Sequence, residues 1–100
     1  MQFQVFELEQ VLDDAEAAYK VSLSTAARSA LIGPVLEAQA FGSAVSNVEV
    51  EASIATIVAE AASQIDPLTR NRTQISSVAI AAAIHRKFCS IPPFCSPPIP

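Results

Sequence analysis

The chain of 100 residues has room for one domain, which excludes two independent hydrophobic cores. Apolar residues make up 51% of it and charged residues only 16%, so the composition excludes a disordered chain. The net charge of −4 hides an asymmetry, because residues 1–60 have a balance of −7 and residues 61–100 one of +3. The second segment has only four basic residues, which are too few and too widely spread to form the basic surface that nucleic-acid binding needs. We therefore expect no nucleic-acid partner.

The amino terminus is acidic and lacks the basic start and the apolar run of a secretory signal. The longest uninterrupted apolar run, residues 78–84, has seven residues, whereas a bilayer span needs about 20. The sequence therefore predicts a cytoplasmic protein that has no membrane partner.

The first part of the chain has apolar residues at the three-to-four spacing of one helical face: Val5, Leu8, Leu12, Ala15 and Tyr19. This spacing predicts a helix over residues 4–20. Ser22 or Ser24 is placed to cap a second helix, which we expect to run through Ile32 and to stop at Gly33-Pro34. A short third helix is expected from Pro34 to Gly42.

The second part of the chain predicts two longer helices. Ser46-Asn47-Val48-Glu49 fits a capping box, in which the Ser hydroxyl and the Glu carboxylate each satisfy an unpaired backbone N–H. The helix that follows has six apolar residues on one side: Val50, Ile54, Ile57, Val58, Ala61 and Ile65. Asp66-Pro67 ends it, and the final helix is expected from Pro67 to Phe88. Its middle is apolar all round, which favours the centre of a bundle or an oligomer interface.

Two segments, 4–8 and 47–51, also alternate with period two, so a short strand stays an alternative at each. No repeat of fixed period is visible. The predicted fold is all-α, a small bundle of four to five helices over residues 1–88. Residues 89–100 (CSIPPFCSPPIP) hold five of the seven prolines and no charge, so they are expected to form an irregular, extended tail.

The candidate chemistry lies in that tail. Cys89 and Cys95 are placed to close a small disulfide ring over Pro92-Pro93, and two unpaired thiols are the equal alternative. His85 lies one helical turn before Cys89, so these three residues are weak candidates for a metal site that would still lack a ligand. The sequence contains neither a phosphate loop nor a nucleophile elbow, so we predict no enzyme and no cofactor.

Two resemblances concern the tail. Ser90-Ile91-Pro92-Pro93-Phe94-Cys95 resembles the second half of the reactive loop of Bowman–Birk-type serine protease inhibitors. Cys89 stands where the residue that enters the protease pocket would be, and we interpret this match as convergent turn chemistry. The whole chain, with a helical front and a short Cys-, Ser- and Pro-rich end, resembles precursors of ribosomally synthesised and post-translationally modified peptides. That resemblance implies that the modified residues are Cys89, Ser90, Cys95 and Ser96.

We therefore predict a precursor-type substrate protein, in which a partner enzyme docks on residues 1–88 and modifies the tail. The alternative is a small helical module for protein–protein interaction, whose proline-rich tail is a binding peptide. The low charge and the Ala-rich last helix also predict a homodimer, because small side chains allow close helix contacts between chains. An isolated bundle with an Ala-lined core is the alternative.

Overall fold

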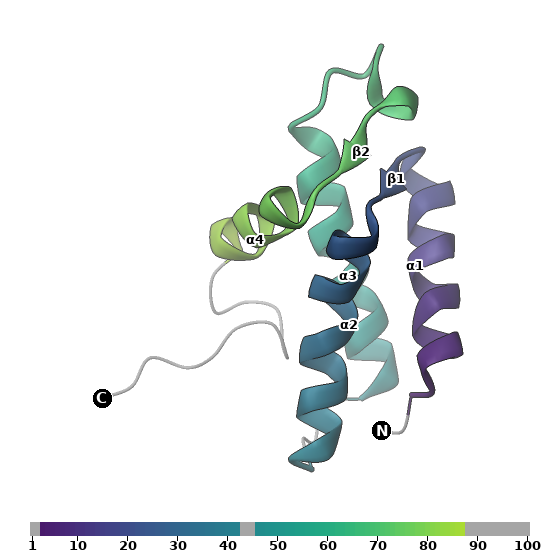
Figure 1. Cartoon of the computed structure of the whole chain (residues 1–100), viewed down its shortest axis with the longest axis vertical. Coiled ribbons are helices and arrows are strands. Elements are labelled where there is room, and N and C mark those ends of the chain that lie inside the picture. Colours follow the sequence, from purple (N-terminus) through teal and green to yellow (C-terminus); the bar gives the residue numbers. More distant parts are fainter. Residues whose placement is uncertain (1–2, 43–45, 88–100) are drawn as a thin grey trace.

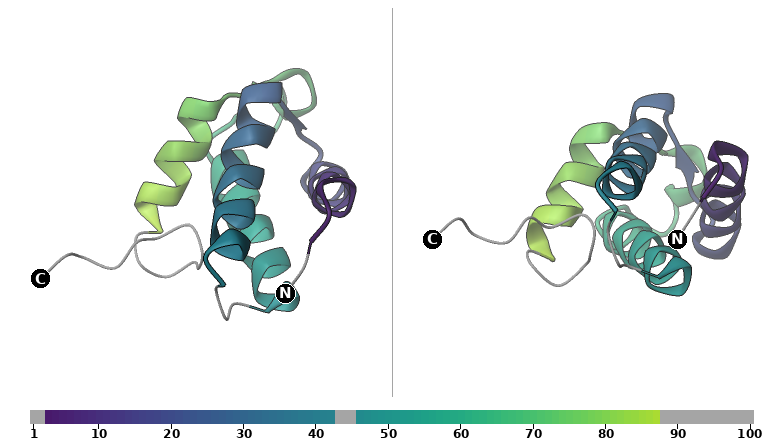
Figure 2. Two further views of the ribbon diagram at one scale, coloured as in Figure 1. Left: turned by 60° about the horizontal axis from the view of Figure 1, so that its bottom comes forward. Right: turned by 90° about the horizontal axis from the view of Figure 1, so that it is seen from below.

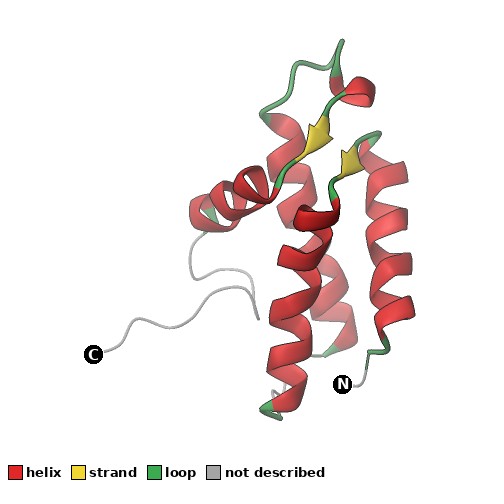
Figure 3. Cartoon of the chain, in the orientation of Figure 1, coloured by secondary structure: helices red, strands yellow, loops and turns green. Residues whose placement is uncertain are grey.

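The structure, a computed structural model, describes residues 3–42 and 46–87 (Figure 1). In chain order its elements are α1 (Val5–Tyr19), β1 (Ser22–Leu23), α2 (Thr25–Ala40), α3 (Asn47–Ser63), the 3-10 turn η1 (Arg70–Arg72), β2 (Gln74–Ile75) and α4 (Ser77–Arg86). Helices dominate the described chain, and only two short strands interrupt them (Figure 3). The predicted all-α bundle is confirmed. The predicted tail, residues 89–100, lies outside the described residues.

The described chain consists of two halves with the same order of elements, helix–strand–helix. β1 of the first half pairs in parallel with β2 of the second, and the register places Ser22 opposite Gln74 and Leu23 opposite Ile75. Corresponding helices pack together, α1 on α3 and α2 on α4. Both views of Figure 2 show α1 and α4 on opposite sides of the central helices α2 and α3. The bundle is therefore a duplicated unit closed by a two-strand bridge.

The sequence carries this repeat in buried positions and in caps. The buried residues Leu8, Leu12 and Ala15 of α1 have the same spacing as Ile54, Val58 and Ala61 of α3. After each strand a serine caps the next helix: Ser24 Oγ accepts the Ala27 N–H at 3.0 Å, and Ser76 Oγ accepts the Ala79 N–H at 3.2 Å. Two residues join helix to strand in the first half (20–21) and ten in the second (64–73), so the repeat has no fixed period.

The predicted break at Gly33-Pro34 is wrong, because α2 continues from Thr25 to Ala40 with Pro34 inside it. A proline in a helix interior costs about 3 kcal/mol, since it lacks an N–H and its ring crowds the preceding turn. Leu31, Ile32 and Val35 on either side are all buried. Each buried side chain of this size is worth about 1.5–3 kcal/mol, so tertiary packing outweighs the local signal.

The other helix boundaries confirm part of the prediction. α1 lies within the predicted span, although Val5 in its first turn is 52% exposed rather than on the buried face. Ser46 caps α3 as predicted, and its Oγ accepts the Glu49 N–H at 3.2 Å. Residues 4–8 and 47–51 belong to helix starts, so neither forms the alternative strand. Ile65 lies beyond the end of α3.

The final helix begins at Ser77, ten residues later than predicted. The Asp66 carboxylate accepts the Leu68 N–H at 3.0 Å and so favours a turn over a helix in this segment. Ile80 and Ala83 of α4 are buried, but Val78 on its outer side is 76% exposed. A central place in the bundle is therefore wrong for α4, and the predicted oligomer interface stays a prediction.

All four helices and both strands contribute to one hydrophobic core. Its largest fully buried side chains are Leu8, Leu12, Leu31, Val35, Val50, Ile54, Ile57, Val58, Ile75 and Ile80. Across residues 3–42 and 46–87, no helix is both long and apolar enough to cross a membrane.

Candidate functional site

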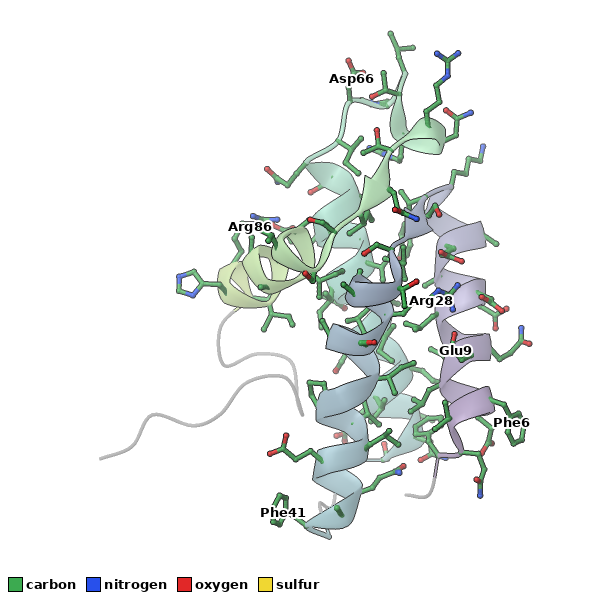
Figure 4. All side chains as sticks on the ribbon, in the orientation of Figure 1. Phe6, Glu9, Arg28, Phe41, Asp66 and Arg86 are labelled. Atoms are coloured by element: carbon green, nitrogen blue, oxygen red, sulfur yellow. The ribbon has the colours of Figure 1, made fainter. Side chains whose placement is uncertain are left out.

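One charged cluster joins α1 to α2. Arg28, in the first turn of α2, lies against three carboxylates of α1 that follow each other along one helical face (Figure 4). Its Nη2 lies 2.6 Å from Asp13 Oδ1 and 2.6 Å from Glu16 Oε1, and its Nη1 donates to Glu9 Oε2. Glu16 Oε2 also accepts the Leu23 N–H of β1 at 2.6 Å. The cluster therefore holds α1, β1 and α2 in place.

The acidic surroundings keep Arg28 charged. Desolvation of the guanidinium by itself lowers the pKa of Arg28, but hydrogen bonds to Asp13 and Glu9 and the charges of Glu16 and Asp13 outweigh that effect. The net result is a raised pKa. Because the cation is occupied by three carboxylates, we assign this cluster a structural role.

The neighbouring acid, Asp14, points to a different side of α1 and lines a groove between α1 and α3. Two adjoining hollows form this groove, with volumes of about 290 and 320 Å³. They share Val11, Asp14 and Glu51. The remaining lining residues are Ala15, Ala18, Tyr19 and Ala55 in the first hollow and Phe3, Phe6, Glu7 and Gln10 in the second. These residues define the acidic groove.

Charge in the acidic groove has one sign. Glu7, Asp14 and Glu51 are acidic, and none of the described residues that line it is Lys or Arg. Glu7 accepts the Gln4 N–H at 2.8 Å, and Asp14 accepts a hydrogen bond from Gln10 at 3.0 Å. Glu51 is exposed and forms no ion pair within the described part of the chain. The groove thus has an apolar floor and carboxylates that are open to a cationic ligand.

The second hollow has an aromatic end. Phe3 is buried there, and its backbone N–H and carbonyl both bond to the Gln39 side chain of α2, the latter at 3.2 Å. This contact fixes the chain just before α1. Phe6, one turn further on, is 73% exposed beside the groove (Figure 4). An apolar side chain of a ligand could therefore bind against the exposed ring of Phe6.

The candidate residues from sequence lie elsewhere. Cys89, Ser90, Cys95 and Ser96 are outside the described residues, and His85 is in the last, exposed turn of α4. The described residues contain no group of three His, Cys, Asp or Glu side chains that could hold a metal ion. The groove escaped sequence reasoning because it needs α1 beside α3. The adjacent pair Asp13-Asp14 was the available signal, since neighbours in a helix face different ways.

Comparisons with protein-family models, with curated proteins and with solved structures find no match. Function is therefore inferred from the groove and from the tail sequence.

Proposed function

We propose that the helical body is a protein-docking module and that the acidic groove is its binding face. The observation that carries this proposal is an apolar groove with three carboxylates and no cation among its described lining residues. The ligand that fits is a segment of a partner protein with apolar side chains on one side and Lys or Arg on the other. Such a segment would place its apolar side chains against Val11, Phe6 and Tyr19.

The tail supplies the second part of the proposal. A partner bound at the groove is an enzyme that modifies Cys89, Ser90, Cys95 or Ser96, as the resemblance to modified-peptide precursors implies. The tail follows α4, which lies on the far side of the bundle from α1 (Figure 2). A fully extended segment of twelve residues spans about 40 Å, so an enzyme held at the groove has a long tether to work on.

Peptide binding tests the groove. The probe is a fluorescent amphipathic peptide of Leu and Lys, and its Leu and Glu counterpart is the negative control. We expect the Lys peptide to bind the full chain and Glu51→Lys to weaken binding about fivefold or more, with a smaller effect at high salt. Glu37→Lys is the matched control, because Glu37 is exposed on α2 and does not line the groove. Equal weakening by both variants would leave only a general charge effect and contradict the proposal.

Intact mass tests the tail. The protein purified from its native host should differ from the sequence mass, and the double variant Cys89→Ala/Cys95→Ala should lose that difference while its helical circular dichroism is unchanged. A loss of two hydrogens alone would indicate a disulfide. An unchanged mass would contradict modification and favour the interaction module with a binding tail.

A further inference from the structure

The connection between α3 and β2 is the largest departure from the duplicated unit. Residues 66–72, here called the basic loop, lie at one end of the molecule (Figure 1). Internal bonds shape the loop: the Thr69 N–H donates to the Asp66 carbonyl at 3.0 Å, and the Arg72 N–H donates to the Thr69 carbonyl at 2.9 Å. Leu68 is 86% exposed, which is the highest exposure among the large hydrophobic residues described. The loop therefore presents an apolar side chain in a defined turn.

Two arginines follow that leucine in the chain. Arg70 is partly occupied, since its Nη2 donates to the carbonyl oxygen of Ile65, just before the loop, at 3.4 Å. Arg72 is exposed and forms no ion pair with any residue that the structure describes. The loop thus presents an exposed leucine near a cation. These two features match the apolar floor and the three carboxylates of the acidic groove.

The loop and the second hollow of the groove lie toward opposite ends of the molecule, whereas the first hollow extends to Tyr19, at the end of α1 nearer the loop. Figure 4 shows Asp66 of the loop at the top and Phe6 of the second hollow near the bottom. Two copies placed antiparallel would therefore bring the loop of each copy to the end of the other copy at which the second hollow lies. The same contact then forms twice, which is the isologous arrangement of a closed, twofold dimer.

We propose that a second copy of this chain occupies the acidic groove, with Leu68 of one copy on the apolar floor and Arg72 near Glu51 and Asp14 of the other. This inference rests on the proposed function, because it uses the same groove. Self-association and partner binding then exclude each other, and the dimer is a resting form that a basic partner segment opens.

Sedimentation velocity of the full chain, with a reductant to keep the tail thiols free, tests the dimer. Two small contacts predict a dissociation constant on the order of 10–100 μM. We expect Arg72→Glu and Glu51→Arg each to weaken association at least about tenfold, because each places like charges together. Glu37→Arg is the matched control and should change nothing.

Mixing the two variants is the decisive arm. In an equimolar mixture, one contact joins the two altered side chains as an opposite-charge pair and the other joins the two unaltered ones, so the dimer should form again. A wild-type chain that stays monomeric to about 500 μM would overturn the proposal, since this is well above the expected constant. A dimer that neither variant weakens, or a mixture that stays monomeric, would overturn it as well.

The peptide probe separates this inference from the proposed function. Monomeric Arg72→Glu keeps the groove intact and should bind the Lys peptide at least as tightly as the wild-type chain. Peptide binding without any dimer would defeat the inference alone. A dimer that obeys the charge exchange but binds no peptide would defeat the proposed function alone.

Discussion

The two halves of the molecule hold their helices together by different kinds of contact at one equivalent position. Position 28 of the first half corresponds to position 80 of the second, because Leu23 pairs with Ile75 and a serine cap follows each. The first half has Arg28 there, held by carboxylates of α1, and the second has Ile80, which is fully buried. α1 and α3 can be aligned by placing the buried residues Leu8, Leu12 and Ala15 opposite Ile54, Val58 and Ala61. In this alignment the three acids of α1 correspond to alanines of α3, at positions 55, 59 and 62.

This difference shows that the helix–strand–helix unit does not depend on one kind of contact. The ion cluster is partly exposed and is open to screening by salt, whereas the apolar contact is not. The first half can therefore keep a polar surface around α1, where the acidic groove lies, while the second half supplies six of the ten largest fully buried side chains.

The largest loss of stability is expected in the second half, at the buried Ile80. Ile80→Ala should lower the free energy of unfolding by about 3 kcal/mol, because it leaves a cavity at a fully buried site. Urea titration followed by circular dichroism measures the change. Val78→Ala on the exposed side of the same helix should alter it by less than about 0.5 kcal/mol. Similar losses in both variants would contradict the buried place of Ile80.

Breaking the ion cluster should cost less. Arg28→Gln is expected to destabilise the protein by about 1–2 kcal/mol in low salt, since it leaves three carboxylates facing each other. In about 1 M NaCl the loss should shrink, because salt screens that repulsion, while the loss in Ile80→Ala should stay.

The pH dependence of the same variant has a defined sign. The folded-state pKa of Arg28 is raised, so its contribution is complete below the unfolded pKa and is lost only as pH rises through the folded value. The difference in unfolding free energy between wild type and Arg28→Gln should therefore be constant from about pH 6 to 9. A steep change across this range would show that another group controls the cluster.

The serine caps of α2 and α4 are the same in both halves, so equal losses of stability are expected when either is removed. Ser24→Ala and Ser76→Ala should each cost about 1 kcal/mol, since each hydroxyl satisfies one backbone N–H at a helix start. Ser→Thr at either site should retain most of the stability. A loss at one site only would mean that one of the two helix starts is held by other contacts.

The smallest effect is expected for the ion pair between α3 and α4. Arg86 Nε lies 2.7 Å from Glu60 Oε1, and the Arg86 side chain is 37% exposed. Arg86→Gln should change the free energy of unfolding by less than about 0.5 kcal/mol, as expected for a solvated pair. A loss as large as that of Arg28→Gln would contradict the distinction between cluster and isolated pair.

The helices with local signals could be predicted from sequence. The spacing of Leu8, Leu12 and Ala15 gave the face of α1, and Ser46 marked the start of α3. The helix across Pro34 could not be predicted, because it depends on burial supplied by other helices. The two strands have two residues each, and their paired residues are 52 positions apart in the sequence, so no local pattern predicts them. The groove also depends on the placement of α1 beside α3, which sequence periodicity does not give.

The parallel bridge provides two adjacent amides that open at different stages of unfolding. The Leu23 N–H donates to Glu16 within the first half, whereas the Ser24 N–H donates to the Ile75 carbonyl of the second half at 2.9 Å. The first bond needs only α1 and β1, and the second needs both halves together. In hydrogen exchange, the amide of Ser24 should therefore exchange at the rate at which the two halves separate. The amide of Leu23 should exchange only when the first half itself unfolds.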